Sequence, residues 1–427
     1  MSFYFFPFEF TFLPGYNTKK LMAAFSLVLW GINLVRKRTF TTNISLFHVS
    51  LYAIIVSLVG LFSVIYNNTP DYTYASYIVS MWVWLGASYV VVEAIKAEHK
   101  IASVDLVCHY LIGVCVVQCI LALIIDNNSF VKDLVDTYVG GLGFVSQEDL
   151  AMKDRLYGIG CSLDVAGTRF AAVLVMISAM LNKHKNKGAW RIYLYLISFA
   201  VIGVVGNMMA RTTTIGVLLA IVYWVVKAYP YDMVIRRDAF KLFRRALTIV
   251  VVVLPFIIYL YNNNYSVRED IRFAFEGFFS LAEKGEWAVS SNDRLKNMYV
   301  FPDNAKTWII GDGYFDGPSS TDPYYVGDPM PGFYMWTDVG YSRFIFYFGL
   351  IGLLSFMLFF MKCSVVCIRS FSKYSLMFKL LLIVNYIIWL KVATDIFLVF
   401  ALFLSIDKED NDEYEEMMAE ESAAIEG

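Results

Sequence analysis

Residues 335–361 read MWTDVGYSRFIFYFGLIGLLSFMLFFM, and this stretch turns from polar to apolar within a few positions. Between positions 341 and 361, Arg343 is the only charged residue. An α-helix needs about 20 mainly apolar residues to cross the roughly 30 Å of hydrocarbon in a membrane. The stretch therefore predicts a membrane-spanning helix with two charged residues, Asp338 and Arg343, at its entrance.

The rest of the chain repeats this apolar pattern. Of its 427 residues 58% are hydrophobic and 17% are charged, and the mean hydropathy is +0.57, far above the apolar share of soluble domains. Strands of alternating polarity are absent, which favours a helical bundle over a barrel. Further apolar segments lie at 21–35, 45–65, 73–95, 101–125, 160–181, 190–208, 211–228, 247–261 and 376–406.

The last of these segments is interrupted by Lys391 and Asp395, so it is either two short helices or a re-entrant pair. If it is counted twice and the apolar stretch 2–13 is added, the total approaches twelve. We therefore expect an all-α, polytopic transmembrane helical bundle of about 10–12 spans. The start, MSFYFFPFEFTFLPG, lacks a basic region and a cleavage site, so we expect it to stay and pack in the membrane.

Basic residues mark one side of the membrane. They concentrate in the connections Arg36 to Arg38, Lys96 to Lys100, Lys183 to Arg191, Arg236 to Arg245, and Lys362 to Lys379. By the positive-inside rule these connections are cytoplasmic, although Lys19 and Lys20 would face outward if residues 2–13 span the membrane. Two long loops, 126–159 and 262–340, then lie on the outer side. Long loops in a compact chain are more often functional than not.

Two stretches outside the spans have a distinctive composition. The last 21 residues, 407–427, hold ten acids and one lysine, which predicts a solvated, disordered tail after a membrane domain over residues 1–406. Within the second loop, residues 266–287 are amphipathic. Their apolar side chains either lie along the lipid interface or pack on the bundle as a lid helix.

Motifs for cofactors are missing. No GxxxxGK[ST] phosphate loop and no HExxH are present, and the Gly-rich stretch GGLGF at 140–144 lacks the lysine. The six cysteines fall mostly within apolar helices and imply neither a disulfide framework nor a metal site. We expect no metal, nucleotide or other cofactor and no nucleic-acid partner. Asp105 and His109 share a helix face, as either a proton relay or a structural pair.

Arginines gather near the predicted outer face. They are Arg155, Arg169, Arg211, Arg294 and Arg343. Arginine is costly near hydrocarbon, stays charged, and offers a planar fork of donors that matches phosphate oxygens. If they converge on one cavity, these residues would bind an anion. The alternative is interfacial snorkelling with local ion pairs.

Carboxylates accompany these arginines in the second loop. Most of them, Asp293, Asp303, Asp312, Asp316, Asp322 and Asp328, fit ordinary turns because aspartate is a common turn former. Asp338 lies just before a helix, where a carboxylate can cap free N–H groups. The other interpretation makes it a general base or an orienting partner for Arg343 or Tyr341.

Several short motifs in the second half resemble the O-antigen polymerase and ligase superfamily. They are ARTTTIG at 210–216, NDR at 292–294, IIGDGYFDG at 309–317, WTDVGYSRFIFYFGLIGLL at 336–354 and NYIIWLKVATDIFLVF at 385–400. The pattern is most similar to the polymerase branch used for bacterial O-antigen and capsule. The resemblance covers residues 200–406, and the first half agrees only in its hydropathy.

This resemblance implies a glycosyltransferase of the bacterial inner membrane that acts on the periplasmic side. Its donor would be a glycan on undecaprenyl pyrophosphate, and its acceptor another lipid-linked repeat unit. The implied partners are these lipid-linked oligosaccharides, the surrounding membrane lipid, and chain-length regulator and flippase proteins. An O-antigen ligase, or a flippase for lipid-linked oligosaccharides, remains the alternative.

The resemblance also implies roles for single residues. Arg211 matches the family's arginine at a span junction and Arg294 the arginine of the large outer loop, so both would bind the lipid pyrophosphate. Ligases of the superfamily present a histidine before the next span, whereas this chain has none after His184 and reads WTDVGY there. Asp338 then becomes the candidate that activates the acceptor hydroxyl. The residues assigned to substrate binding are Arg343, Tyr341, Arg169 and Arg155.

Overall fold

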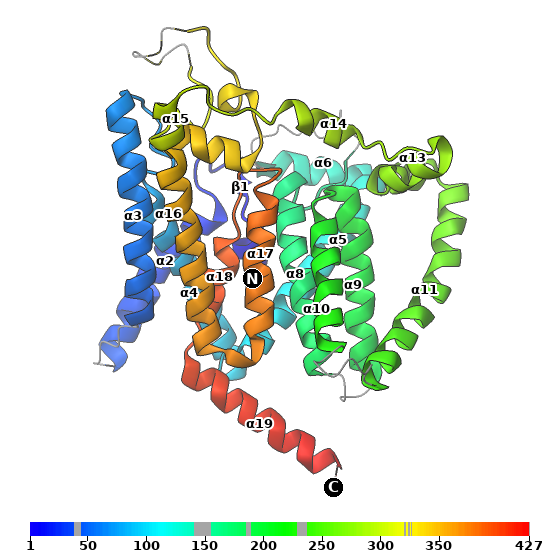
Figure 1. Ribbon diagram of the computed structural model, residues 1–427. Coiled ribbons are helices and arrows are strands. Elements are labelled where there is room, and N and C mark those ends of the chain that lie inside the picture. Colours follow the sequence, from blue (N-terminus) through cyan, green and yellow to red (C-terminus); the bar gives the residue numbers. More distant parts are fainter. Residues whose placement is uncertain are drawn as a thin grey trace.

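The computed structural model describes residues 1–37, 44–140, 155–184, 189–228, 237–319, 322, 325 and 327–426, and helices dominate them (Figure 1). The first helices are α1 (Ser2–Phe5), α2 (Thr18–Lys37), α3 (Ile44–Asn67), α4 (Tyr77–His99), α5 (Val104–Asn127), α6 (Ser129–Tyr138), α8 (Leu163–Lys183) and α9 (Ala189–Met209). A short antiparallel pair, β1 (Glu9–Phe10) and β2 (Val139–Gly140), joins the N-terminal stretch to the end of α6.

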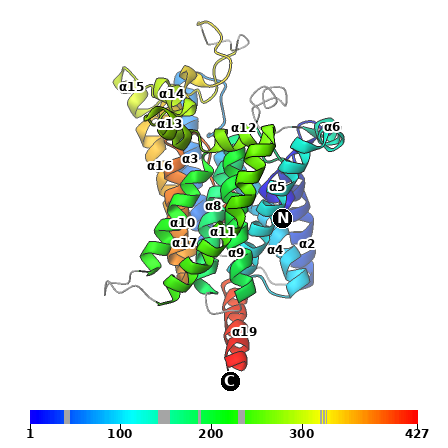
Figure 2. The same ribbon diagram turned by 90° about the vertical axis from the view of Figure 1, so that its right-hand side faces the viewer.

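The second half continues the bundle and adds short helices above it. They are α10 (Thr213–Ala228), α11 (Arg237–Asn263), α12 (Tyr265–Ala274), α13 (Glu276–Lys284), α14 (Ser290–Asn297), α15 (Ala305–Ile309), η1 (Tyr334–Trp336), α16 (Gly340–Ser370), η2 (Ser372–Tyr374), α17 (Ser375–Ile388), α18 (Phe397–Leu404) and α19 (Lys408–Glu426). We call the end of the bundle that carries α12–α15 the loop end and the opposite end, which carries α19, the tail end (Figures 1 and 2).

The fold is the predicted all-α membrane bundle. Among the described residues, seven helices are long and apolar enough to cross a membrane, namely α2, α3, α4, α5, α8, α9 and α16. Helices α10, α17 and α18 are shorter, and α11 runs along the bundle beside α9 (Figure 1). Within the described ranges, fewer helices therefore reach full span length than the 10–12 we expected.

Helix α8 forms the centre of the bundle. Its membrane-spanning window is 83% buried, and it packs against α5, α9, α10 and α17. A Cβ atom added to Gly216 of α10 would lie 2.3 Å from the Cα atom of Ala171 in α8. Small residues let two helix backbones approach closely in a membrane, and this contact places the start of α10 beside the start of α8.

Helix α16 is broken in its first third, where a loop enters the bundle. Gly349 has φ 67 and ψ −173, so the regular hydrogen-bond ladder stops there. The amide of Asp312 donates to Phe346 O at 2.6 Å, and the amide of Gly313 donates to Tyr347 O at 3.1 Å. Irregular backbone at membrane depth is tolerated where protein groups satisfy it, and the IIGDG segment meets this condition.

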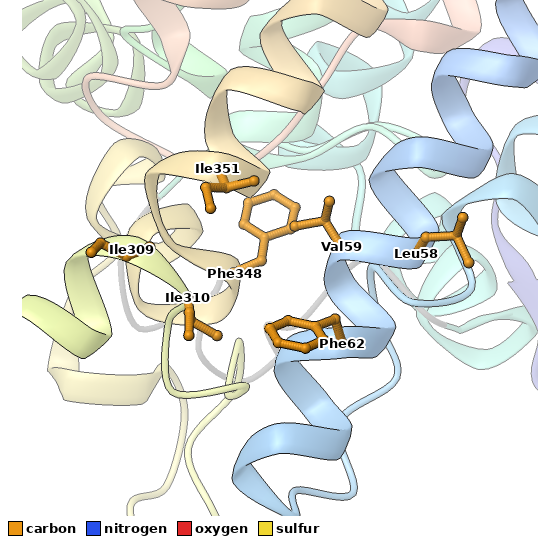
Figure 3. A pocket seen from close by; sticks show the side chains of 7 residues that line it. All are labelled: Leu58, Val59, Phe62, Ile309, Ile310, Phe348 and Ile351. Carbon is orange, nitrogen blue, oxygen red and sulfur yellow. The ribbon is translucent and has the colours of Figure 1, made fainter.

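An apolar cavity of about 200 Å³ lies beside this break. Figure 3 shows its lining side chains, which come from α3, from α15 and the residue after it, and from α16. They are Leu58, Val59, Phe62, Ile309, Ile310, Phe348 and Ile351. All seven are apolar, so the cavity offers no polar partner for a charged ligand.

The segment 376–406 forms two short helices with an irregular stretch, 389–396, between them. In this break the indole of Trp389 donates to Thr394 O at 2.8 Å, and the amide of Ile396 donates to Asn385 Oδ1 at 3.1 Å. These bonds satisfy groups that a continuous helix would have paired internally. The break brings Lys391 to the loop end, where it meets α8.

The N-terminal stretch 2–13 is not a span, so that part of our count was wrong. Its helix α1 has four residues, too few to cross a membrane. Tyr4, Phe5 and Phe6 are fully buried within the bundle. The hydroxyl of Tyr4 donates to Leu398 O in α18 at 2.6 Å, which anchors the stretch inside the protein.

The acidic tail also differs from our expectation, because it forms helix α19 and its first half docks on the tail end. Asn411 Oδ1 accepts a hydrogen bond from Val104 N at 3.1 Å, where α5 begins. The buried Glu415 accepts from Tyr374 Oη at 2.7 Å and also pairs with Lys183. Basic side chains of the bundle thus neutralise one face of α19, and the composition alone does not reveal these partners.

The two members of the Asp105 and His109 pair have separate partners at the tail end. Asp105 accepts from Lys183 Nζ at 2.9 Å and from Tyr374 Oη at 2.8 Å. The imidazole of His109 pairs instead with the hydroxyl of Tyr195. Asp105 therefore belongs to the network that holds α19, and this arrangement favours the structural interpretation.

Candidate functional site

Two of the predicted arginines meet at the loop end on one aromatic ring. The guanidinium carbon of Arg211 lies 4.0 Å from the ring centroid of Phe273, and that of Arg155 lies 4.9 Å from the same centroid. Arg211 comes from the turn between α9 and α10, whereas Phe273 comes from α12. Two like charges so close together repel one another, so the pair attracts an anion.

Helices α12 and α13 supply that anion from within the chain. Arg211 Nε donates to Phe273 O at 3.0 Å, and Arg211 Nη2 lies 2.6 Å from Glu276 Oε2. Partial burial lowers the pKa of Arg211 and outweighs the opposing effect of Glu276. Of the two interpretations of residues 266–287, the lid fits best, because α12 packs on α9. Phe278 nevertheless remains 62% exposed.

A lysine, an aspartate and a threonine form a second group directly beside Arg211. Lys391 Nζ lies 3.1 Å from both Asp164 Oδ1 and Thr212 Oγ1. The hydroxyl of Thr212 in turn donates to Asp164 Oδ1 at 3.0 Å. The side chains of Lys391 and Asp164 are each about one third exposed, at 31% and 32%, so solvent and ligands reach them.

We call Arg155, Arg211, Lys391, Asp164 and Glu276 the cationic mouth. Three of these five side chains are positive and two are negative, so their summed formal charge is positive. Its members come from the segment before α8, the first turn of α8, the α9–α10 turn, α13 and the break between α17 and α18. The helix packing described above assembles them at one place, and the resulting group can bind an anion.

Arg169 lies deeper in the bundle than the mouth. It is five positions after Asp164 in α8 and only 8% exposed. Its guanidinium carbon lies 5.4 Å from the ring centroid of Phe6 and 6.0 Å from that of Phe5, and its Nη1 has no hydrogen-bond partner. Asp395, from the α17–α18 break, interacts with it electrostatically. Arg169 is thus separated from the mouth by about one and a half helical turns.

Arg343 holds the large loop instead of facing the mouth. It is 4% exposed, and its Nη2 donates to Phe315 O at 2.9 Å and to Asp316 Oδ1 at 2.8 Å. Its guanidinium carbon lies 3.6 Å from the ring centroid of Phe315 and 4.0 Å from that of Phe333. Burial raises the pKa of the Asp316 carboxyl despite the attraction of Arg343.

Asp338 and Tyr341 lie at the start of α16, next to the break that carries Lys391. The N-cap residue of α16 is Val339, whose side chain forms no cap hydrogen bond, so Asp338 precedes the cap position. Asp338 is partly buried and interacts electrostatically with Arg343. The amide of Tyr341 donates to Trp389 O at 3.1 Å, which places the start of α16 beside the break that carries Lys391.

Arg294 lies in α14, and the placement of its side chain is outside the described residues. The backbone around it is well connected. Ser290, the first residue of α14, donates through its amide to Glu276 Oε1 at 3.2 Å. After α14, the hydroxyl of Thr337 donates to Met298 O at 2.5 Å, and that of Tyr299 donates to Leu390 O at 2.7 Å. Helix α14 therefore runs between the lid and the start of α16.

Sequence reasoning found the two arginines of the mouth but missed its other members. The sequence does show that Lys391 interrupts an apolar segment, and this charged position is the signal from which Lys391 could have been assigned to the mouth. Asp164 and Glu276 carried no comparable signal, because single carboxylates before or within helices are common. In the described part of the chain, no group of three or more His, Cys, Asp or Glu side chains is placed to hold a metal ion.

Comparison with known proteins identifies no relative for this chain. No protein-family model, no curated protein and no solved structure matches it. Any functional conclusion therefore has to come from the residues and their geometry.

Proposed function

We propose that this multi-pass membrane protein is a glycosyltransferase that polymerises lipid-linked oligosaccharide repeat units for a bacterial surface polysaccharide, either O-antigen or capsule. The observation that carries the proposal is the cationic mouth at the loop end, where Arg155 and Arg211 stack on Phe273 beside Lys391. A polyprenyl diphosphate presents its charge at this level, just above the hydrocarbon.

The orientation of the chain supports the same proposal. Lysines of the connections contact α19 at the tail end, among them Lys96, Lys183 and Lys373. By the positive-inside rule the tail end is cytoplasmic, so the loop end would face the periplasm of an inner membrane. Finished lipid-linked repeat units would meet the mouth there.

The chemistry needs little more than positioning and charge stabilisation. An acceptor hydroxyl oxygen attacks the anomeric carbon of the donor glycan, and the bond from that carbon to the diphosphate oxygen breaks. The polyprenyl diphosphate leaves with the electron pair, and Arg211, Arg155 and Lys391 stabilise its charge. The hydroxyl proton passes to a carboxylate, for which Asp338 is our candidate. Asp164 orients Lys391 through their ion pair.

Deletion of the gene in its host tests the proposal. A strain without the polymerase is expected to make surface glycans of one repeat unit and no long chains, which a gel of these glycans displays. Restoration of long chains by the intact gene is the control. Unchanged polymer length in the deletion strain would contradict the proposal.

Two other activities give different outcomes in the same experiment. A ligase deletion leaves long polymer on its lipid carrier, because only the final transfer is lost. A flippase deletion leaves lipid-linked repeat units on the cytoplasmic side. One observation favours a transporter: Asp395 and the buried Arg169 interact beside a discontinuous helix, as ion and substrate sites of transporters do.

A further inference from the structure

Glu276, one of the two carboxylates of the cationic mouth, occupies the position in which Arg211 would hold a bound anion. Its carboxylate lies 2.6 Å from Arg211 Nη2. The same carboxylate accepts hydrogen bonds from Ser290 N at 3.2 Å and from Ser290 Oγ at 3.0 Å. Guanidinium groups and the free N–H groups at a helix start are both typical ligands of phosphate. The Glu276 carboxylate thus binds both the guanidinium group of Arg211 and the first residue of α14, Ser290.

We propose that Glu276 is an internal placeholder for a diphosphate group, and that an incoming diphosphate displaces it and lifts α13 from the mouth. This inference rests on the proposed function for the nature of the ligand. It adds a regulatory step to that function, since the empty mouth would be closed by the chain's own carboxylate. Binding of the donor would then open it.

The charge balance of the mouth agrees with this exchange. Arg155 and Arg211 share the ring of Phe273, and the carboxylate of Glu276 pairs with Arg211. A carboxylate carries one negative charge, whereas a diphosphate carries more and has several acceptor oxygens. It can therefore pair with both guanidinium groups and with Ser290 N–H simultaneously. The exchange replaces a singly charged carboxylate with a more highly charged diphosphate at the same hydrogen-bond donors.

The construction of the lid permits such a movement. Glu276 is the first residue of α13, and its side chain is 33% exposed. Helix α13 is followed by Gly285, which has φ +74 and nothing within 4 Å of an added Cβ atom. The end of α13 is thus not packed against the bundle at this glycine. Helix α12 packs on α9 and α11, whereas α13 is held by the stack of Phe279 on Tyr261 and by the ion pair of Glu283 with Arg272. Lifting of α13 would separate these two side-chain contacts.

Binding of a diphosphate to the purified chain in lipid nanodiscs tests the inference. The probes are inorganic pyrophosphate in solution and a polyprenyl diphosphate incorporated in the nanodisc lipid. Replacing Glu276→Gln keeps the shape but removes the competing charge, so the dissociation constant is expected to fall about tenfold, as when a competing closed state is removed. Arg211→Ala is expected to abolish the binding of both probes.

Glu286→Gln is the matched control. Glu286 follows α13 directly after Gly285, and its side chain is exposed. It should leave the dissociation constant unchanged. Tightening with the polyprenyl probe alone supports the inference with the lipid head group as ligand, and tightening with both probes means that the diphosphate suffices. Equal or weaker binding by Glu276→Gln overturns the inference.

A second measurement needs no change in Glu276. Ser280 lies in α13 and is 7% exposed, and all six native cysteines are buried. In a Ser280→Cys variant, pyrophosphate is expected to accelerate reaction of the new thiol with a water-soluble maleimide several-fold. An unchanged rate overturns the lifting of α13. Both measurements read binding and movement without glycan transfer, so they can succeed even if the deletion strain still makes long polymer.

Discussion

The guanidinium carbon of Arg343 lies 3.6 Å from the ring centroid of Phe315, and its Nη2 donates a hydrogen bond to Phe315 O at 2.9 Å. Phe333 covers the same guanidinium at 4.0 Å. One arginine of α16 thus joins two segments of the large loop that are separated by 18 positions. Because Asp338 and Tyr341 lie just before this arginine, the clamp also positions the entrance of α16.

Replacing Arg343→Ala is expected to loosen the large loop. The change removes two hydrogen bonds and leaves two aromatic rings without their partner, which should lower stability by about 1–3 kcal/mol. Thermal unfolding of the purified protein measures the loss. Lys296→Ala is the control, because the ion pair of Lys296 with Asp293 is exposed on both sides. An equal melting temperature for Arg343→Ala and the intact protein would contradict the clamp.

Replacing Gly349→Ala is expected to disrupt the junction of α16 with the IIGDG segment. Gly349 has φ +67, and an added Cβ atom would lie 2.1 Å from Ile309 O. The strain should cost about 1–3 kcal/mol, seen as a lower melting temperature. Gly31→Ala in α2 is the control, since nothing lies within 4 Å of its added Cβ atom. Similar behaviour of the two variants would show that the break is not required.

Replacing Arg211→Ala is expected to abolish long-chain polymer while the protein still inserts in the membrane. Arg211 stacks on Phe273 and pairs with Glu276 in the mouth, so under the proposed function its loss removes a ligand of the diphosphate. Glycan gels and membrane immunoblots measure the two effects. Arg272→Ala removes a comparable arginine that pairs with Glu283 on the lid and should keep normal polymer. Normal chain length in a stable Arg211→Ala variant removes this residue from the mechanism.

Replacing Asp338→Asn is expected to abolish polymer without a change in melting temperature. Asparagine keeps the size of the side chain but cannot take up the acceptor's proton. The N-cap position belongs to Val339, so loss of a cap does not account for the effect. Full activity of Asp338→Asn would assign proton removal to another group.

Acid is expected to release α19 from the tail end. Burial of Glu415 acts to raise its pKa, but hydrogen bonds from Lys183 and Tyr374 outweigh burial, so the net pKa is lowered. A carboxylate with a lowered pKa stabilises the docked state at pH values above its ordinary pKa of about 4.3. That stabilisation is lost as the pH falls through the lowered value.

Limited proteolysis of the C-terminal segment across this pH range measures the release. Glu415→Gln has no charge to titrate, so its cleavage should be faster at neutral pH and should depend less on acid. Equal and pH-independent cleavage of the two proteins would show that Glu415 does not hold α19.

Local patterns gave the class of fold but not every element. The window around 341–361 predicted a helix that the structure has as α16, because the length and polarity of a span are properties of consecutive residues. The break in this helix at Gly349 was not predicted, since its cause is the distant IIGDG segment. The helix α19 was missed for the same reason, because its partners Lys183 and Tyr374 lie far away in the chain.

The candidate site was likewise predicted only in part from the sequence. Arg155 and Arg211 were selected by residue type and by their place near span ends, and they do meet. Arg343 was selected on the same grounds but serves the loop, and Arg169 lies deeper in the bundle. Residue type tells which side chains attract anions, yet it does not tell which of them face one another.

The sequence by itself determined a polytopic helical membrane protein, because burying about 20 apolar residues in hydrocarbon is a local requirement that each segment meets alone. Only the tertiary structure decided that Lys391 pairs with Asp164 across 227 positions and that Glu276 pairs with Arg211. Such pairs depend on how α8, α10 and the α17–α18 break pack together. Close packing is a property of the whole bundle, and no single segment encodes it.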